Sequence, residues 1–587
     1  MKTTRSKSRC TPFFPVLLWA AHLLLLGVVV WIVDHFNPHE IEKILKIWVP
    51  WNFIANLVFI SVGLFLCRHD ICGALKKLRR RRVAPLLLLP ASVFVFIVWA
   101  VPATHRIYYD EDIYINTAQT LAYANRSGFC NYGTFENGKY QPHWIAYNKQ
   151  PAGWPFLISL VFRFMGTREM YAFFLNIFVF CGSIIMVYLI TRKMTADGMM
   201  AFVAALVYAV MPHNLIWANT AAAEHAAAFF TGLTILLAVI FLTGGKDRHL
   251  FLLSVCLPFA AQMRPESILI YPLILLCFVI ISPGILRQRK IWIFAVLAAV
   301  FILPHLLHLY TVSGQKWGAD HSKFSMLYFG RNFSDNGLYF LNHRYFPTAL
   351  TVLAAIGLLG SSHLLKFRIL TATWFIFFWG VFIFFYAGSY GYGADDRFAL
   401  LAFMPLAVLA GLGSGRLRDK AVFLTRRIGI LPGIRLQPVY LVILAVIILE
   451  FVYFLPFVRQ TGEEAWASRH DHLFAEKFIR NIPQDAIVLT HNPTMFLNWG
   501  QGAIQAYTGI AHPDHIRRLL EKTNGHVYFH HDYWCNTDSK APQRLCRAIS
   551  EKYELIEVGR ARERDYTYGL FQMRVRNAEE TINLVEK

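Results

Sequence analysis

Three consecutive acids, Asp110, Glu111 and Asp112, follow a hydrophobic run in a chain that is otherwise basic, with a formal net charge of +21. Charged groups beside a bilayer are costly to place, so acids in this position need a reason. A carboxylate can take the proton from a hydroxyl group within its reach and so activate that hydroxyl as a nucleophile. The alternative is that the acids form the solvated start of a helix, where the helix dipole favours negative charge.

Four further ionisable residues lie in or beside apolar sequence. Glu224 falls within an apolar segment, so we expect it to face the protein interior or a wet cavity, either lining a site or forming a structural salt bridge. The other three are basic, and each has a structural alternative to a functional role. Lys149 could be solvated in a loop, Arg264 could extend its head group to the membrane surface, and Arg397 could pair with the two acids before it.

The composition indicates a polytopic membrane protein. Of the 587 residues, 56% are hydrophobic and 16% are charged, and the mean hydropathy is +0.42. Soluble domains contain about 25% charged residues, and about 20 apolar residues are needed to cross a bilayer as a helix. Thirteen segments are candidate transmembrane helices, the first being a retained anchor: 13–33, 51–67, 84–102, 170–191, 199–212, 222–243, 249–262, 266–284, 291–311, 346–363, 369–388, 397–413 and 438–457.

The distribution of Lys and Arg predicts the orientation of these helices. If the N terminus is cytoplasmic, the loops on the cytoplasmic side are the richer in basic residues, with clusters at 76–82 and 416–435. This is the bias expected of cytoplasmic loops. The excess of positive charge is then explained by topology and anionic lipid headgroups, so we expect no nucleic acid partner.

Three segments assigned to the outer side are too long to be simple turns: 104–169, 312–345 and the tail from 458 to 587. The first has two stretches with apolar residues at helical spacing, which suits helices lying in the membrane interface. The tail alternates helix-like and strand-like patterns, which predicts a small soluble α/β domain. It also contains Cys535 and Cys546, for which a disulfide is permitted on this side of the membrane.

Several short motifs resemble, in their order along the chain, those of the GT-C membrane glycosyltransferases. The resemblance is to the protein O-mannosyltransferase and lipid A aminoarabinose transferase group, whose bacterial relatives use polyprenyl-phosphate sugars. It covers about 84–560 and implies an N-terminal helix pair at 1–83, a catalytic core at 84–457 and an extracytoplasmic domain at 458–587. The motifs are DExxY (Asp110, Glu111, Tyr114), KxP (Lys149, Pro151) before an aromatic helix ending at Gly166, the acid Glu224, Arg-Pro-Glu (Arg264, Pro265, Glu266) and Arg-aromatic (Arg397, Phe398).

The resemblance also implies a role for each candidate residue. Asp110 would be the catalytic general base, and Glu111, the second catalytic residue, would help to hold the site either by hydrogen bonding or by binding a divalent cation. Lys149, Arg264 and Arg397 would bind the donor phosphate, whose developing negative charge needs a cation beside it. Asp112, Tyr114 and Glu224 would line the site, Tyr114 lying one helical turn after Asp110. Asp110, Asp112 and Glu224 are also candidate ligands of a divalent cation, Mg²⁺ or Mn²⁺, although no cofactor is required by the motifs.

The implied function is an inverting transfer of a hexosyl or pentosyl group from a polyprenyl-phosphate carrier to an acceptor hydroxyl outside the cytoplasm. Inversion follows if the reaction is a single displacement with one base. We expect a monomer in the bacterial inner membrane, with the acceptor being a lipid, a polysaccharide or a protein. The alternative is a transporter or flippase of a lipid-linked sugar, because intramembrane charge is also common in transporters. Transporters usually contain internal repeats, and none is evident in the sequence.

Overall fold

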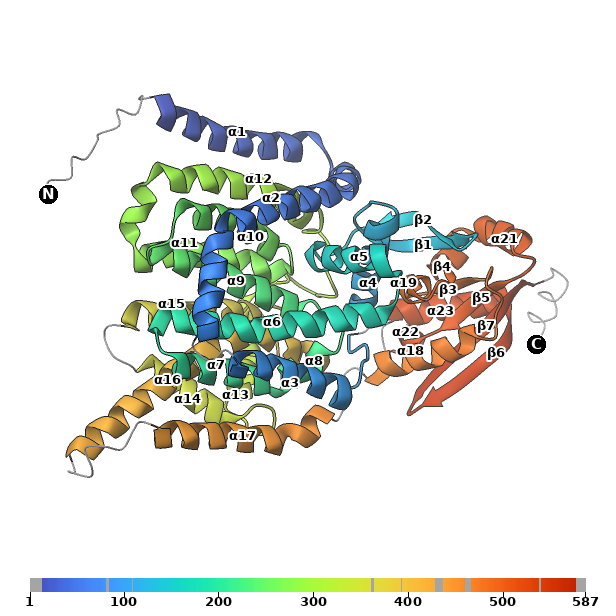
Figure 1. Ribbon diagram of the computed structural model, residues 1–587. Helices are drawn as coiled ribbons and strands as arrows, with labels where there is room; N and C mark the ends of the chain where they lie inside the picture. The colour runs from blue at the N-terminus through green and yellow to red at the C-terminus, as the bar shows by residue number, and fades with distance from the viewer. Residues whose placement is uncertain are drawn as a thin grey trace.

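The structure is a computed structural model that describes residues 13–80, 84–107, 109–359, 364–391, 393–427, 437–459, 466–537 and 540–576. Tyr108 and parts of the two predicted cytoplasmic basic clusters, at 81–82 and 428–435, lie outside the described residues. Figure 1 shows a helical bundle on one side of the molecule and a smaller sheet-containing part on the other. The helices α4 and α5 lie between the two.

Each of the thirteen predicted transmembrane segments overlaps a helix, although residues 360–363 of the segment 346–363 lie outside the described residues. Among the described residues, seven helices are long and apolar enough to cross a membrane, or eight if α7 and α8, bent by 61°, form one broken span. The number of crossings therefore stays a prediction. The helices that overlap the predicted segments, together with α8, which directly follows α7, are α1 (Phe13–His35), α2 (Pro38–Arg80), α3 (Ala84–Ala100), α6 (Glu169–Thr195), α7 (Gly198–Val210), α8 (Pro212–Ala218), α9 (Glu224–Leu242), α10 (Asp247–Ala261), α11 (Ile270–Ile281), α12 (Arg289–Thr311), α14 (Thr348–Leu358), α15 (Leu365–Ile383), α16 (Leu400–Arg427) and α17 (Gln437–Arg459).

Burial distinguishes the centre of the bundle from its rim. The most apolar window of α16 is fully buried, whereas only 22% of the corresponding window of α17 is buried. A helix that is apolar on all sides and exposed on one face is what lipid contact requires. Short elements connect the long helices at both ends: η1 (Pro265–Leu269), η2 (Pro283–Arg287), η3 (Met326–Tyr328), α13 (Phe329–Tyr339) and η5 (Gly393–Ala399).

The first outer segment forms two helices, as predicted, and a hairpin that was not predicted. The helices are α4 (Asp110–Tyr123) and α5 (Gly153–Met165), and between them lie β1 (Phe129–Glu136) and β2 (Lys139–Ala146). Asn137 and Gly138 make the turn with φ angles of 50° and 72°. An Asn-Gly pair is the usual signal for such a turn, so the hairpin was readable in the sequence. Most of α4 is buried against protein, because α5, β1 and the C-terminal part all pack on it.

The C-terminal part is an α/β domain, as predicted, but its sheet begins in the first outer segment. The seven strands lie in the order β2-β1-β4-β3-β5-β7-β6, with β4, β3 and β5 parallel and the other pairs antiparallel. A domain limited to 458–587 therefore leaves out β1 and β2. Its own elements are α18 (Trp466–Ile479), β3 (Ile487–Thr490), α19 (Pro493–Asn498), β4 (Gly502–Gln505), α20 (Thr508–Ala511), α21 (Pro513–Lys522), β5 (Val527–His531), α22 (Tyr533–Asn536), α23 (Lys540–Lys552), β6 (Tyr553–Glu563) and β7 (Tyr566–Val575).

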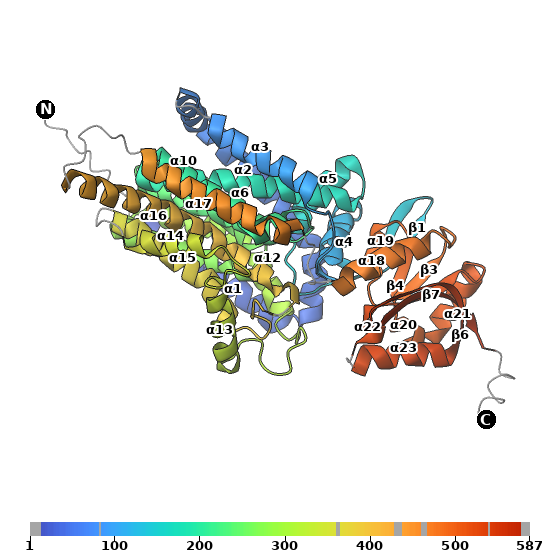
Figure 2. The same cartoon turned by 90° about the horizontal axis from the view of Figure 1, so that it is seen from below.

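The C-terminal domain is cross-linked by a disulfide and packs against α4. Cys535 and Cys546 form a disulfide with a Cα–Cα distance of 5.7 Å, which confirms the pairing that the sequence permitted. Figure 2 shows α18 and α19 on the side of the sheet that faces α4, while α23 lies on the far side. The amide of Gln119 in α4 donates to the carbonyl of Leu497 at 3.1 Å, which is one of the bonds that join the domain to α4.

Candidate active site

Helix α4 separates two of the three acids. Successive residues of an α-helix are rotated by about 100°, so Asp110 and Asp112 point to nearly opposite sides. The preceding residue, Tyr109, has a φ of 80°, a conformation that is strained for a residue with a Cβ. Strain of this kind persists where the surrounding structure enforces it, often at functional sites. Here it starts the helix so that Asp110 faces the bundle.

Asp110 lies among positive charges. Its Oδ2 is 3.3 Å from Nη2 of Arg397, and Gln150 donates a hydrogen bond to the carboxylate. Burial opposes ionisation of Asp110, but the charges of Lys149 and Arg397 outweigh it, so the pKa of Asp110 lies below its ordinary value. The side chain is therefore a carboxylate at neutral pH, the form that can accept a proton.

Arg397 joins Asp110 to Glu224. Its Nε is 3.3 Å from Oε1 of Glu224, a residue that is fully buried at the start of α9. Asp395 is farther away, at 3.9 Å from Nη2. Local pairing with the preceding acids is thus the weaker interaction of Arg397, and its nearest partners come from other parts of the chain.

Arg264 completes this charged group. Its guanidinium pairs with Glu224 and with Glu266, and only 5% of the residue is exposed, so it does not extend to the membrane surface. Burial opposes the charge of Arg264, but the two glutamates keep its pKa above the ordinary value. Buried ions of opposite sign depend on one another, because removing one partner leaves a desolvated charge.

Some polar atoms of the group have no hydrogen-bond partner within the part of the chain that the structure describes. These are Oε2 of Glu224 and two nitrogens of Arg397, Nη1 and the Nε that lies 3.3 Å from Glu224, all of them buried. A buried guanidinium N–H without an acceptor is costly unless a ligand supplies one. The ring of Phe398 lies 5.0 Å from the guanidinium carbon of Arg397 and 5.5 Å from that of Arg264, and it covers both.

The backbone explains how these residues are brought together. Arg264 is extended (φ −147°, ψ 159°), as a residue before proline should be, and this breaks the chain between α10 and η1. Beside the break, the N–H of Gly153 donates to the carbonyl of Gln262 at 3.0 Å. A Cβ at position 153 would lie 2.4 Å from that oxygen, so only glycine permits this approach. The contact holds the segment containing Lys149 next to Arg264.

Tyr114 lies on the same face of α4 as Asp110, as predicted from their spacing. Its hydroxyl donates to Oε1 of Gln150 at 2.8 Å, and the residue is 1% exposed. Gln150 therefore connects Asp110 and Tyr114, although sequence reasoning did not select it. The only available signal was its place directly after Lys149 in the KxP motif.

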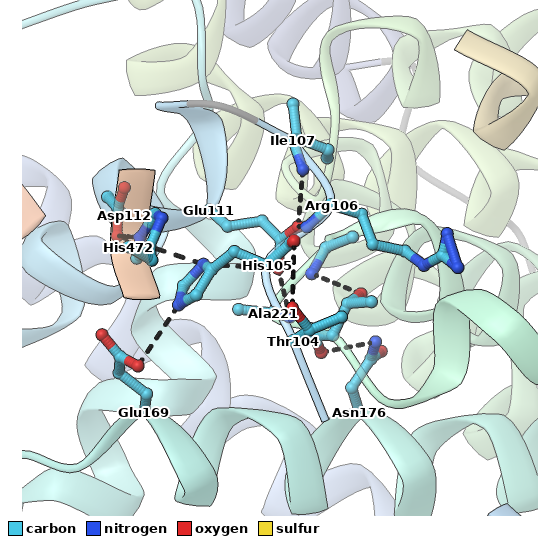
Figure 3. A network of polar contacts seen from close by, with 12 residues as sticks. Thr104, His105, Arg106, Ile107, Glu111, Asp112, Glu169, Asn176, Ala221 and His472 are labelled. Carbon is cyan, nitrogen blue, oxygen red and sulfur yellow. Dashed lines mark hydrogen bonds and ion pairs between the residues drawn. The ribbon is translucent and has the colours of Figure 1, made fainter. Parts of the chain in front are cut away.

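Glu111 is occupied by the backbone. Its Oε1 accepts hydrogen bonds from the N–H groups of Arg106 and Ile107, at 2.7 and 3.0 Å, and its Oε2 accepts one from Ala221 at 2.7 Å. Figure 3 shows these bonds converging on the carboxylate. Glu111 thus ties the loop before α4 to the loop before α9, in agreement with a role in holding the site. These three hydrogen bonds occupy most of the acceptor sites of the carboxylate.

Asp112 faces the C-terminal domain. Its Oδ1 is 3.0 Å from Nε2 of His472, and its Oδ2 accepts a bond from Nδ2 of Asn492 at 2.6 Å. His105 and Glu169 are close to the same group (Figure 3). Asp112 is fully buried, and charge from His472 and His105 outweighs the effect of burial, so its pKa lies below the ordinary value.

The three acids suggested as cation ligands are not brought together. Asp110 and Glu224 share Arg397, whose guanidinium stands beside both carboxylates, while Asp112 points to the other side of α4. A guanidinium in this position repels a metal ion. Binding of Mg²⁺ or Mn²⁺ near Asp110 stays a prediction, and any such ion would need a ligand other than Asp112.

Part of the chain matches a known protein family, and its fold is similar to that of solved structures. Residues 149–308 match the family of dolichyl-phosphate-mannose-protein mannosyltransferases. The fold is similar to that of ArnT from Cupriavidus metallidurans, with a TM-score of 0.53 and 11% sequence identity over 82% of this chain and 97% of ArnT. The chain has the GT-C glycosyltransferase fold. The membrane-protein architecture, expected from the composition, and the likeness to GT-C transferases, expected from the motifs, are thereby confirmed.

Two further solved structures are also similar to this chain. ArnT bound to undecaprenyl phosphate is similar to this chain to the same extent, with a TM-score of 0.53 and the same coverage of 82% and 97% at 11% identity. An oligosaccharyltransferase of Archaeoglobus fulgidus tethered with an acceptor peptide gives a TM-score of 0.46 at 14% identity, over 84% of this chain and 74% of that protein. No curated protein matches the chain in sequence.

Proposed function

We propose that the protein transfers a sugar from a polyprenyl-phosphate carrier to an acceptor hydroxyl on the outer face of the membrane, with inversion at the anomeric carbon. The observation that carries the proposal is the position of Arg397. It contacts the carboxylate of Asp110 with one nitrogen and keeps another, Nη1, without a partner among the described residues. A base and a donor available for phosphate thus lie side by side.

The chemistry needs both groups. A hydroxyl is a poor nucleophile until a base takes its proton, and a lipid phosphate is a poor leaving group until a cation stabilises its charge. Asp110 is ionised at neutral pH, and Arg397 and Lys149 both lie close enough to lower its pKa. Arg264 adds a third positive charge through its contact with Glu224.

The reaction is a single displacement. The acceptor oxygen forms a bond to the anomeric carbon while the bond from that carbon to the phosphate oxygen breaks. The hydroxyl proton moves to Asp110, and the electron pair of the broken bond leaves with the lipid phosphate beside Arg397 and Lys149. No step passes through a metal ion.

Donor binding also adjusts the base. In the absence of donor, Lys149 and Arg397 hold the pKa of Asp110 below its ordinary value. A phosphate that takes up these two positive charges reduces their effect on Asp110, so its pKa rises and it becomes a stronger base. A base works best when its pKa approaches the operating pH. We infer that the carboxylate becomes fully reactive only when the donor is in place.

The same proposal also predicts where the reaction takes place relative to the membrane. The lipid tail of the donor stays in the bilayer, so the site must open near the membrane surface, where α4 and α5 join the bundle to the C-terminal domain (Figure 2). We place this domain outside the cytoplasm and the N terminus inside, in a bacterial plasma membrane. The acceptor is a lipid, a polysaccharide or a protein.

The test uses purified protein reconstituted in vesicles with a panel of polyprenyl-phosphate sugars. We expect release of free polyprenyl phosphate from one donor, and a product whose anomeric configuration, measured by NMR, is opposite to that of the donor. Asp110→Asn should abolish this release. Asp320→Asn, which changes an exposed acid of the second outer segment, is the matched control and should remain active.

Three outcomes would contradict parts of the proposal. Movement of the intact donor across the bilayer without release of polyprenyl phosphate would identify a flippase, the alternative considered from the sequence. Retention of the donor's anomeric configuration in the product would exclude a single displacement. Full activity of the Asp110→Asn variant would instead remove Asp110 from the role of base.

A further inference from the structure

A second polar cluster lies on the opposite side of α4 from Asp110. It consists of His105 from the loop before α4, Asp112 from α4 and His472 from α18 of the C-terminal domain. All three residues are buried, with exposed fractions of 4%, 0% and 8%. One ligand atom from each lies within 4.8 Å of the others, which is close enough for all three to contact one ion.

The individual distances define which atoms face the centre. Oδ1 of Asp112 is 3.0 Å from Nε2 of His472 and 4.0 Å from Nδ1 of His105. Ligands of a tetrahedral zinc ion lie at about 2.0–2.2 Å from the metal, so neighbouring ligand atoms are separated by roughly 3.3–3.5 Å. The two distances from Asp112 differ from this spacing by about half an ångström or less, and the two histidine nitrogens lie within 4.8 Å of one another.

The atoms that face away from the centre are held by neighbouring side chains. Nε2 of His105 is 3.3 Å from Oε2 of Glu169, whose other oxygen accepts a bond from Trp499 at 2.7 Å. Oδ2 of Asp112 accepts the bond from Asn492. A carboxylate behind a ligating histidine and a hydrogen bond behind a ligating carboxylate are the usual supports of a metal site.

The imidazoles point to an ion rather than to a closed hydrogen-bond network. The rings of His105 and His472 are stacked with their centroids 4.3 Å apart and an angle of 11° between their planes. Two protonated rings at this distance repel one another. In addition, Nδ1 of His105, the nitrogen on the side away from Glu169, makes no hydrogen bond to any described residue, although the side chain is almost fully buried. An imidazole nitrogen donates in the plane of its own ring, so binding of one cation requires the two stacked rings to turn away from parallel, and the cation then takes the place of the hydrogen bond between His472 and Asp112 and gives Nδ1 of His105 a partner.

We propose that His105 Nδ1, Asp112 Oδ1 and His472 Nε2 bind a Zn²⁺ ion that joins the C-terminal domain to the start of α4. Two imidazoles and one carboxylate form a donor set typical of zinc, with water in the fourth position. His105 and His472 also line a cavity of 1330 Å³, which supplies room for that water. Because one ligand comes from each of three segments, the ion fixes the domain against the helix that carries Asp110.

The first measurement is made on the wild-type protein with a tag that contains no histidine. The protein is treated with EDTA, exchanged into metal-free buffer, and then incubated with ZnCl₂ and desalted. We expect about one zinc per chain by elemental analysis, a higher thermal midpoint with zinc than without, and an X-ray absorption spectrum of nitrogen and oxygen ligands with imidazole scattering. A wild-type chain that retains no zinc after this treatment overturns the proposal, whatever its transferase activity.

His472→Gln separates metal binding from hydrogen bonding. A glutamine amide can still donate to Asp112 but is a poor zinc ligand. We expect the variant to lose bound zinc and the zinc-dependent rise of the thermal midpoint, while its midpoint without zinc stays near that of the wild type. Retention of zinc would exclude His472 as a ligand. His470→Gln, two residues away in the same helix, is the control and should bind zinc like the wild type.

Two more variants keep the test decisive if His472→Gln folds poorly. His472→Cys restores a ligand, and Co²⁺ substitution should then give a thiolate charge-transfer band that the wild type lacks. Glu169→Gln removes the carboxylate behind His105 and should weaken zinc affinity by about 10- to 100-fold without abolishing binding. Cobalt spectra that are the same in the wild type and in His472→Cys would overturn the assignment.

Discussion

Asp110 and Asp112 are two residues apart in one helix, yet their surroundings have little in common. Asp110 lies among Lys149, Arg264 and Arg397, which come from the bundle and its outer loops. Asp112 lies among histidines and asparagines, three of which, His472, Asn492 and Asn498, come from the C-terminal domain. The first environment contains permanent charges, and the second contains groups that can bind a proton or a metal.

The difference shows how adjacent acids in one helix come to have different partners. Because α4 is buried on all sides, each successive acid meets a different part of the protein: Asp110 the arginines, Glu111 the backbone of two loops, and Asp112 the domain. A cluster of acids at the same end of an exposed helix would share one solvated face. Burial therefore gives three similar residues three different surroundings: arginines beside the proposed base Asp110, two loops joined at Glu111, and the C-terminal domain at Asp112.

The largest effect should come from comparing Asp110→Asn with Asp112→Asn. Loss of a general base typically lowers a rate by about 100- to 10,000-fold. We expect a loss of this size in polyprenyl phosphate release for Asp110→Asn, and less than about tenfold for Asp112→Asn, whose effect on the reaction is only through the position of α4. Equal losses in the two variants would show that the two acids act as one unit.

The next largest effect should come from changing Arg397, the proposed phosphate-binding residue beside Asp110. Arg397→Lys keeps the positive charge but removes the planar guanidinium that reaches Asp110 and Glu224 together. We expect release of polyprenyl phosphate to fall by about 100-fold, the usual cost of losing one preorganised donor. The control is Arg331→Lys, at a side chain that is 70% exposed in the outer segment, which should keep its activity.

A smaller effect should follow from moving Lys149 without changing it. Gly153→Ala places a methyl group against the carbonyl of Gln262, so the segment before α5 must shift away from Arg264. Displacement of a positioning group by about 1 Å can cost up to 100-fold, and we expect a loss of about tenfold or more in activity. Gly330→Ala, where a Cβ meets nothing within 4 Å, is the matched substitution. Wild-type activity of Gly153→Ala would mean that this approach does not position the site.

The sequence was informative where a physical constraint acts locally. Apolar segments had to become helices in a bilayer, and the cost of burying Glu224 and Arg264 made both residues stand out from the apolar sequence around them. The acids of α4 were found in the same way. Their separate partners were not predictable, because the direction of Asp112 matters only once α18 is known to lie beside it, and His472 is 360 positions later in the chain.

The hairpin at residues 129–146 could have been predicted from its Asn-Gly turn, which is a clear local signal. The sequence could not show that β1 also pairs with β4, in the C-terminal domain. Strand pairing over this sequence distance leaves no periodic trace in either segment. Gln150 was missed because an uncharged residue beside a lysine has no unusual cost in a loop, although its amide joins Asp110 to Tyr114.

The smallest effect, and the most direct test of the comparison, is a double-mutant cycle on thermal stability in metal-free buffer. Asp112 and His472 are in contact at 3.0 Å, so Asp112→Asn and His472→Ala should be non-additive by about 0.5–3 kcal/mol. Asp110 faces the other side of α4, away from His472, so Asp110→Asn and His472→Ala should add within about 0.5 kcal/mol. Coupling of His472 to Asp110 as strong as to Asp112 would mean that the two sides of α4 are not independent, and that the domain senses the charge of Asp110.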